Sequence, residues 1–258
     1  MLWKASTIHG YAIAASDGEI GKVSDFLFDD ATWLIRWLVV ETGGWLFGRK
    51  VLLPPSVLGH PDESGRQFSV RLTKKQVQES PTTDTNQPVS RQVETGIFDY
   101  YGWSPYWGTG FYMGGYGFVP PPIAALSSGQ SRKQADDFAD AGKGSGDPHL
   151  RSMEAITGYH IHASDGEIGH VEDFLVADAD WSIHYLIVDT KNWWPARKVL
   201  ISPRSAREID WMDRLVYLDV DRKTVESSPA YDATTIVDRA YEKDFHGHYT
   251  AGRPSDGL

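Results

Sequence analysis

The chain contains one segment twice, and this repeat limits the possible folds more than any other feature. Residues 148 positions apart match without a gap, so that Ile8-His9-Gly10-Tyr11 corresponds to Ile156-Thr157-Gly158-Tyr159 and Ser80-Pro81 to Ser228-Pro229. Nearly half of the positions from Ile8 to Pro81 are identical in the second copy. Unrelated segments do not agree this well at a fixed spacing, so we expect two copies of one small folding unit.

The repeat also predicts how the chain is divided. The match continues past the proline, where Arg91, Glu94 and Tyr101 correspond to Arg239, Glu242 and Tyr249. Residues 106–149 follow only the first copy and are rich first in Gly and aromatic residues, then in Ser, Gly, Lys and Asp. This composition is typical of a linker. The predicted division is therefore a first repeat at 1–105, a linker at 106–149 and a second repeat at 150–258.

Within each copy the apolar pattern favours short strands. Residues 33–40 alternate between an apolar face and a face that begins polar and ends apolar, and residues 181–188 do the same. Further strands are predicted at 23–29, 50–53 and 68–72 and at the corresponding positions of the second copy. Several short strands with turn signals between them predict an all-β fold, either a small barrel or a sandwich.

Turn and cap residues complete the predicted unit. The loop Ser16-Asp17-Gly18-Glu19-Ile20-Gly21 recurs as residues 164–169, and Asp-Gly between two strands predicts a hairpin turn with positive φ. Thr73 and Gln76 have the spacing of a capping box. We therefore expect each unit to end in a short helix that stops at Ser-Pro.

Composition excludes several classes of function. The 258 residues include no cysteine, which rules out disulfides, zinc–thiolate sites and cysteine nucleophiles. The 35 acidic and 25 basic residues leave a net charge of −10, which opposes binding to nucleic acid or anionic lipid and favours a basic partner. No run of about 18 apolar residues and no secretion signal is present, so a cytoplasmic location and no membrane span are expected.

Both copies resemble the PRC-barrel family. The resemblance rests on the Gly-Tyr start, Ser-Asp-Gly-Glu-Ile-Gly, Val-x-Asp-Phe-Leu, a Trp-initiated strand ending Leu-Val-Val-Glu-Thr, and Arg-Lys-Val-Leu-Leu-Pro-Pro. This family includes the cytoplasmic domain of the photosynthetic reaction-centre H subunit and the C-terminal domain of a ribosome maturation factor. The resemblance implies two small PRC-type β-barrels, each with a short helix, and a role in binding or assembly without shared catalytic residues. Stand-alone tandem copies are most similar to an uncharacterised bacterial branch of the family.

Two kinds of side chain could form a polar site. Asp17 with Glu19, and Asp165 with Glu167, are carboxylate pairs that could serve acid–base chemistry or a hard cation. Their position in turns favours a structural role for the aspartates. His160 and His162, like His246 and His248, could point the same way on a strand and hold a metal. The first copy has Ala12 and Ala14 in place of His160 and His162, and no third ligand is evident, so these histidines are weak metal candidates.

Motifs for enzymes are missing from the sequence. Gly108-Thr109-Gly110 lies among aromatic residues and Pro with no following helix, unlike a phosphate-binding loop. The patterns HExxH and Gly-x-Ser-x-Gly do not occur. We therefore expect no catalytic residues, no cofactor and no enzymatic activity.

The aromatic tract from Phe98 to Phe118 is the most unusual local feature. It contains no Lys or Arg up to Pro122, so it lacks the basic groove that base stacking on nucleic acid requires. Either the tract covers the barrels, or it forms an adhesive surface for a partner. The candidate interaction surface comprises Trp103, Tyr106, Trp107 and Tyr112.

These observations favour a non-enzymatic protein–protein interaction or assembly module, with the two barrels packed as an intramolecular pseudo-dimer. The alternative is a small-ligand or metal-binding protein that uses the inter-barrel cleft or His160 and His162. Neither hypothesis identifies the protein or ligand that binds.

Overall fold

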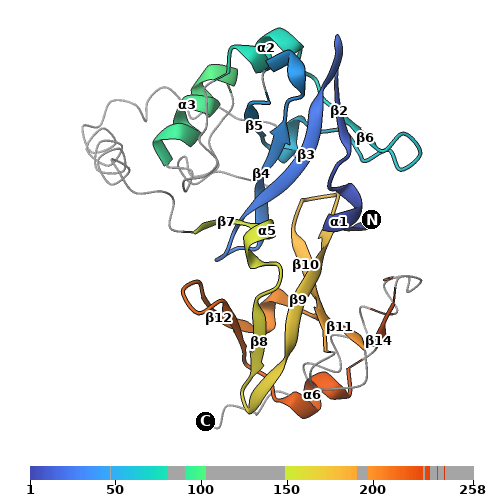
Figure 1. The fold of residues 1–258 in the computed structure, drawn as a ribbon, viewed down its shortest axis with the longest axis vertical. Coiled ribbons are helices and arrows are strands. Elements are labelled where there is room, and N and C mark those ends of the chain that lie inside the picture. Colours follow the sequence, from blue (N-terminus) through green and yellow to red (C-terminus); the bar gives the residue numbers. More distant parts are fainter. Residues whose placement is uncertain are drawn as a thin grey trace, which may run out of the picture.

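A computed structural model describes residues 1–46, 48–80, 91–102, 149–190, 197–228, 230–232, 237 and 241. These residues form two sheets with few and short helices, which confirms the expected all-β class (Figure 1). None of the described helices is both long and apolar enough to cross a membrane.

The first barrel is the sheet with strand order β5-β4-β3-β2-β6. All neighbours in it are antiparallel except β2 and β6, which are parallel. Short helices connect or follow the strands. The elements are β2 (Ala12–Ala15), β3 (Gly18–Asp29), β4 (Leu34–Glu41), η1 (Gly44–Leu46), β5 (Lys50–Leu53), η2 (Pro55–Val57), β6 (Gln67–Ser69), α2 (Lys74–Gln78) and α3 (Arg91–Tyr101).

The second barrel is the sheet with order β12-β13-β8-β9-β10-β11-β14, in which β13 and β8 are parallel. Strands β8, β9, β10 and β11 correspond in position and pairing to β2, β3, β4 and β5 of the first barrel. Its elements are β8 (His160–Ala163), β9 (Gly166–Ala177), β10 (Ile183–Asp189), β11 (Lys198–Ile201), η4 (Pro203–Ser205), β12 (Ala206–Asp210), β13 (Leu215–Leu218), α6 (Arg222–Glu226) and β14 (Ala230–Tyr231).

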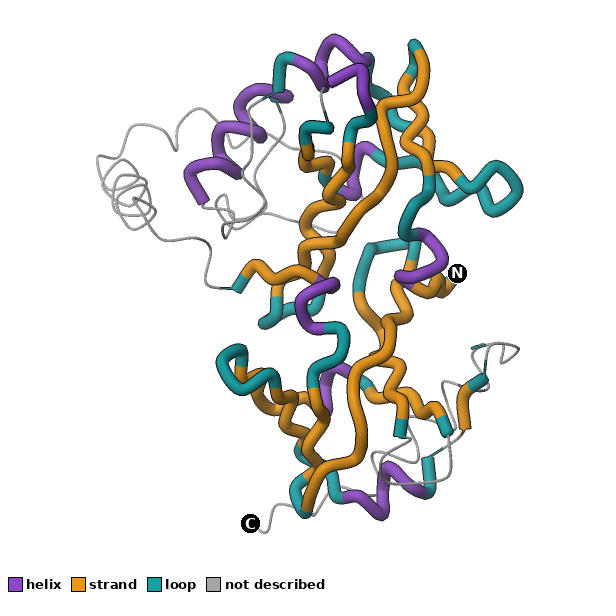
Figure 2. The backbone as a smooth tube through the Cα atoms, in the orientation of Figure 1, coloured by secondary structure: helices purple, strands orange, loops and turns teal. Residues whose placement is uncertain are grey.

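A strand and a short helix precede each barrel, and each such pair packs on the other barrel. Strand β1 (Leu2–Lys4) pairs with β9, and β7 (Leu150–Ser152) pairs with β3. The helices α1 (Ala5–Ile8) and α5 (Met153–Ile156) follow them and lie between the barrels (Figure 2). The two halves of the chain therefore exchange segments across their common boundary.

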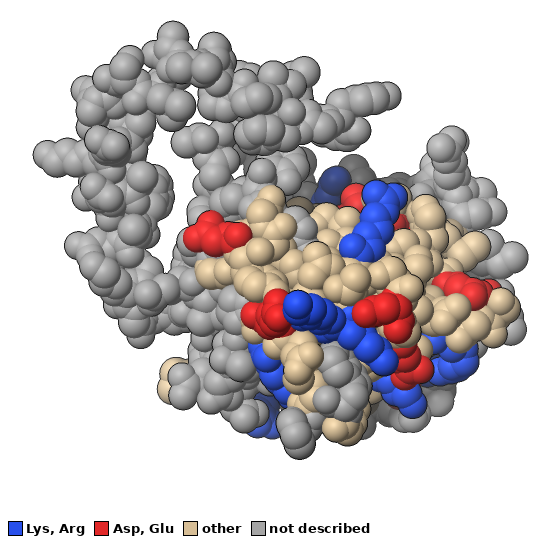
Figure 3. Space-filling model, turned by 90° about the horizontal axis from the view of Figure 1, so that it is seen from above, with Lys and Arg blue, Asp and Glu red and all other residues tan. Residues whose placement is uncertain are grey.

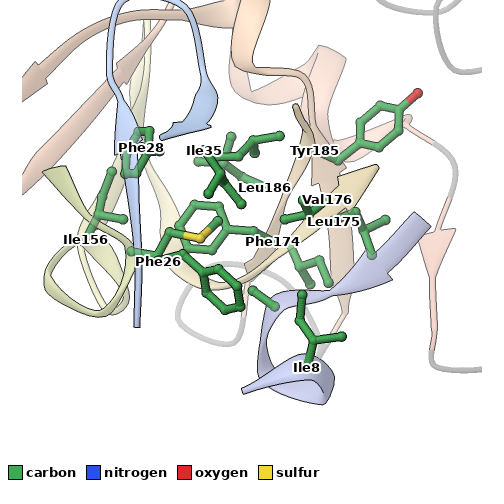
Figure 4. Packing of buried hydrophobic residues seen from close by; sticks show 14 of the residues in the cluster. Ile8, Phe26, Phe28, Ile35, Ile156, Phe174, Leu175, Val176, Tyr185 and Leu186 are labelled. Atoms are coloured by element: carbon green, nitrogen blue, oxygen red, sulfur yellow. The ribbon is translucent and has the colours of Figure 1, made fainter. Parts of the chain in front are cut away.

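One hydrophobic core runs through both barrels. The ring centroids of Phe28 and Phe174 are 6.5 Å apart across the boundary, and Ile8 and Ile156 of the exchanged helices are buried beside them (Figure 4). Because burial of apolar area is the main source of folding free energy, this shared core couples the stability of the two halves.

A second, smaller core lies under α3. Trp37, Val39 and Leu52 point away from the first core and are covered by Ile97 and Phe98 of the helix. Leu27 pairs with Trp37 and Phe28 with Ile35, so β4 has one extra residue, Arg36, at this point. Ile35 therefore lies in the first core, whereas Trp37 and Val39 lie in the second. The simple alternation expected for residues 33–40 is therefore interrupted by a bulge.

The predicted helix cap is confirmed, and two turn predictions need correction. The side chains and backbones of Thr73 and Gln76 form the expected capping box at α2. The hairpin turn is made by Ser16 and Asp17, with Gly18 (φ +131°) already the first residue of β3. Trp33 does not begin a strand: it has φ +57° and ends the preceding turn, so β4 begins at Leu34.

Candidate interaction surface and inter-barrel site

The turn carboxylates expected to be structural hold the closing helices. The Asp17 carboxylate accepts a hydrogen bond from the backbone N–H of Lys74 at 2.8 Å, and Asp165 accepts one from Arg222 at the same distance. Lys74 is the first residue of α2 and Arg222 the first residue of α6. The backbone N–H groups at a helix start have no partner within the helix. These contacts span the fold and are not local to the turn. Glu19 and Glu167 are exposed.

The structure does not gather a metal site around His160 and His162. Nδ1 of His160 lies 2.7 Å from Oε1 of Glu167, and the two side chains are 52% and 44% exposed. The ring of His162 faces Tyr217 at 5.9 Å. Among the residues that the structure describes, no three His, Asp or Glu side chains come close enough to hold an ion. His246 and His248 lie outside the described residues.

The aromatic tract is described only at its beginning. Phe98 packs against Trp37 with ring centroids 5.2 Å apart, and the Tyr100 hydroxyl donates to the carbonyl of Gln76 at 3.0 Å. This part of the tract covers the first barrel. The proposed surface residues Trp103, Tyr106, Trp107 and Tyr112 lie outside the described residues.

The inter-barrel boundary contains polar contacts that the sequence analysis did not single out. Asp25 accepts hydrogen bonds from the Ser152 hydroxyl at 2.6 Å and from the backbone N–H of Glu154 at 3.1 Å. Asp173 accepts from the hydroxyl and the backbone N–H of Ser6 at 2.5 and 3.1 Å. Each aspartate thus anchors the exchanged helix from the other half. The available signal was the Val-x-Asp-Phe-Leu motif, which occurs in both copies.

Burial of Asp25 changes its acidity. Desolvation raises the pKa of this carboxyl above its ordinary value, although hydrogen bonds from Ser152, Phe26 and Glu154 act in the opposite direction. The carboxyl serves as an anchor for the exchanged helix α5.

Two tryptophans join the barrels through their backbones. Trp33 and Trp181 both adopt left-handed φ values, 57° and 59°, which are rare for bulky residues. The N–H of Ile35 donates to the carbonyl of Trp181 at 2.9 Å, and that of Ile183 donates to the carbonyl of Trp33 at 2.8 Å. The strained turns are therefore held by reciprocal hydrogen bonds across the boundary.

The turns before these tryptophans form two corresponding corners. In one corner, Asp178 lies 2.6 Å from the N-terminal amine and accepts from the Trp3 indole at 3.4 Å. Burial raises the pKa of Asp178, but the hydrogen bonds from these two groups outweigh it and hold the pKa below its ordinary value. In the other corner, Asp30 contacts Nδ1 of His149 at 2.8 Å and Nε of Arg151 at 3.2 Å.

Comparison with known proteins agrees with this fold. Residues 4–76 match the family model of the PRC-barrel domain. An uncharacterized protein of Deinococcus radiodurans is 34% identical over 82 residues, which are 32% of this chain and 29% of that protein. The chain thus spans less than a third of this relative's length.

Proposed function

Because this chain carries a PRC-barrel domain at residues 4–76, we propose that it is a non-enzymatic module for protein–protein interaction or assembly. The exchanged segments are the observation that supports this function. Each barrel binds a strand and a helix from outside itself, through main-chain pairing and one aspartate. Surfaces of this kind bind extended polypeptide by strand addition.

The roles of the carboxylates support the non-enzymatic part of the proposal. Asp17 and Asp165 hold helix starts, while Asp25 and Asp173 anchor the exchanged helices. These contacts account for the four carboxylates by structural roles, so the proposal assigns none of them to acid–base chemistry.

The exposed charge gives a second argument about partners. At the end of the molecule where α2 lies, acidic and basic side chains are interspersed (Figure 3). Mixed surfaces of this kind do not concentrate a field of one sign, as a nucleic-acid-binding face does. Exclusion of nucleic acid, a cytoplasmic location and the division into 1–105, 106–149 and 150–258 stay predictions.

Affinity capture with the full chain tests the assembly function. The bait is washed at about 0.5 M salt, where surface electrostatics are screened beyond about 4 Å, and an unrelated protein of equal net charge serves as control. We expect a protein retained only by the bait, which after purification forms a complex of fixed stoichiometry with the full chain in light scattering. Failure of every captured protein to bind directly would contradict the proposal.

The metal-binding alternative has weaker support. His160 is already paired with Glu167, and the described residues contribute no third ligand. Metal analysis of the purified full chain tests it: a stoichiometric ion that is lost on changing His160 and His162 to Ala would favour this alternative.

A further inference from the structure

One of the two corners between the barrels contains a cavity of about 310 Å³. It is bounded by the β3–β4 turn of the first barrel, by the start of β7, and by β12 with its following turn. Cavities that bind small molecules begin at about 300 Å³, so this one has room for a single ring or side chain. Its lining residues are Asp30, Ala31, Trp33, His149, Arg151, Ala206, Arg207, Glu208, Ile209 and Trp211.

Arg151 is positioned in this cavity with part of its hydrogen-bonding capacity unused. Its guanidinium carbon lies 4.5 Å from the ring centroid of Trp211, and its Nε donates to Asp30 at 3.2 Å. No described residue accepts a hydrogen bond from either of its terminal nitrogens. The side chain is 27% exposed. A stacked arginine held in this way presents two parallel donors, the geometry that pairs with a carboxylate.

The apolar walls beside Arg151 favour a ligand with a flat or apolar part. Trp33 stacks on Phe28 with ring centroids 5.4 Å apart and remains partly exposed at the cavity, where Ile209 also lies. An aromatic ring placed between these side chains would be removed from water while a carboxylate reaches Arg151.

The corresponding corner differs in each of these features. Trp3 occupies the position equivalent to Arg151, and Glu63 the position equivalent to Trp211. Trp181 packs on Phe68 at 5.8 Å and is buried, whereas the position equivalent to Phe68 in the second barrel is the smaller Val216. The arginine and the aromatic wall therefore belong to one corner only.

We propose that this cavity binds a carboxylate carried on a flat or apolar group, with Arg151 as its anchor. The site is independent of the assembly function. Its carboxylate could come from a free aromatic acid or from the C-terminus of a peptide, and both present the same chemistry to the guanidinium.

The other charged residues at the cavity determine which kind of anion it favours. Glu208 is exposed at the rim and opposes an anion, but solvent screens it more than it screens Arg151. Asp30 is engaged by Arg151 and His149. Arg207 also lines the cavity, but it is exposed and its guanidinium lies 5.9 Å from the ring centroid of Tyr217. With Arg151 as the one partly buried cation of the lining, a singly charged carboxylate suits this site better than a phosphate of higher charge.

Titration of the full chain with benzoate tests the proposal. Binding is followed by the NMR signals of the indole N–H groups, assigned with the variants Trp33→Phe and Trp211→Phe. We expect saturable binding that shifts the Trp33 and Trp211 signals and is at least about tenfold weaker in Arg151→Gln, the loss of one charged hydrogen-bonded pair. The exposed Arg71→Gln is the charge-matched control, with affinity unchanged, and Glu208→Gln should bind more tightly.

Benzamide and phenyl phosphate test the chemistry of the ligand. Benzamide binding as tight as that of benzoate, tighter binding of phenyl phosphate, or no saturable binding would each overturn the proposal. If Arg151→Gln fails to fold, Arg151→Lys keeps the charge, loses the paired donors, and should still weaken benzoate binding. N-acetylphenylalanine distinguishes the sources: tighter binding than benzoate identifies a peptide terminus, and weaker binding a free acid.

Discussion

At the scale of single residues, the two copies keep the same side chains where backbone geometry leaves no alternative. A Cβ atom on Gly21 would overlap the carbonyl oxygen of Glu41, and one on Gly169 would overlap that of Asp189. The strands approach so closely there that only glycine fits, which explains why both copies have it.

Replacing either glycine should destabilise the protein. We expect Gly21→Ala and Gly169→Ala each to lower the free energy of unfolding by about 1–3 kcal/mol, because the backbone of a packed strand has to move. Urea denaturation measures the loss. Gly43→Ala is the matched control, since a Cβ there meets no atom within 4 Å, and an equal loss in the control would refute the explanation.

The carboxylate of the last residue of β3, Asp29, should make stability depend on pH. Burial raises the pKa of Asp29, but hydrogen bonds from Thr32 and Arg36 outweigh it and lower the pKa below 3.8. Since the folded pKa is below the unfolded one, the stabilisation is complete above pH 3.8 and is lost as the pH falls through the folded pKa.

Asp29→Asn should therefore cost about 1 kcal/mol at neutral pH and progressively less in acid. Urea unfolding of both proteins at several pH values measures the difference. The exposed Glu19→Gln provides the control and should show no comparable trend. A deficit in Asp29→Asn that is the same at neutral and strongly acidic pH would contradict this assignment.

At the scale of elements, polar contacts connect helices to sheets in both halves. The Arg49 guanidinium donates to the carbonyls of Gln78, at 3.1 Å, and Ser80, and Arg197 donates to those of Glu226, at 3.0 Å, and Ser228. Each arginine thereby holds the end of the closing helix against the start of a strand. The helix α3 is fixed differently, because Glu94 is buried and accepts from the Trp37 indole at 2.6 Å.

Removing the indole donor should loosen α3. Trp37→Phe takes one hydrogen bond from a buried carboxylate, so we expect a loss of about 1–3 kcal/mol in the free energy of unfolding. The double variant Trp37→Phe/Glu94→Met should recover part of that loss, because it removes both the indole donor and the carboxylate acceptor. A double-mutant cycle in urea measures the coupling, and additive effects of the two changes would argue against the contact.

At the scale of the whole molecule, the exchanged segments and the shared core make the halves dependent on each other. Strands β1 and β7 each complete the sheet of the other half. A half expressed alone would expose the apolar residues that meet at the boundary, such as Phe28 and Phe174.

The two halves should therefore associate when they are separated. We expect residues 1–105 and 150–258, coexpressed with a tag on one of them, to copurify as an equimolar complex and to be less stable singly. Gel filtration and thermal unfolding measure both properties. Halves that do not associate, and that are each as stable alone as in the full chain, would show that the boundary is not an interface.

Local sequence patterns accounted for much of the fold. The Thr73 capping box, the hairpin beginning at Ser16 and most strand positions depend on residues within a few positions of each other. The start of β4 was wrong by one residue, because the left-handed backbone of Trp33 is stabilised by hydrogen bonds to the other half. The candidate site was less predictable, since Asp25, Asp30 and Arg151 find their partners more than a hundred residues away.

The sequence alone predicted the repeated unit, its β-strands and its family resemblance, because spacing, periodicity and turn residues act over short distances. The exchange of β1 and β7 between the halves and the cavity beside Arg151 became evident from the tertiary structure. Strand pairing and packing between distant segments depend on how surfaces fit in space, and two similar halves leave different spaces where their side chains differ.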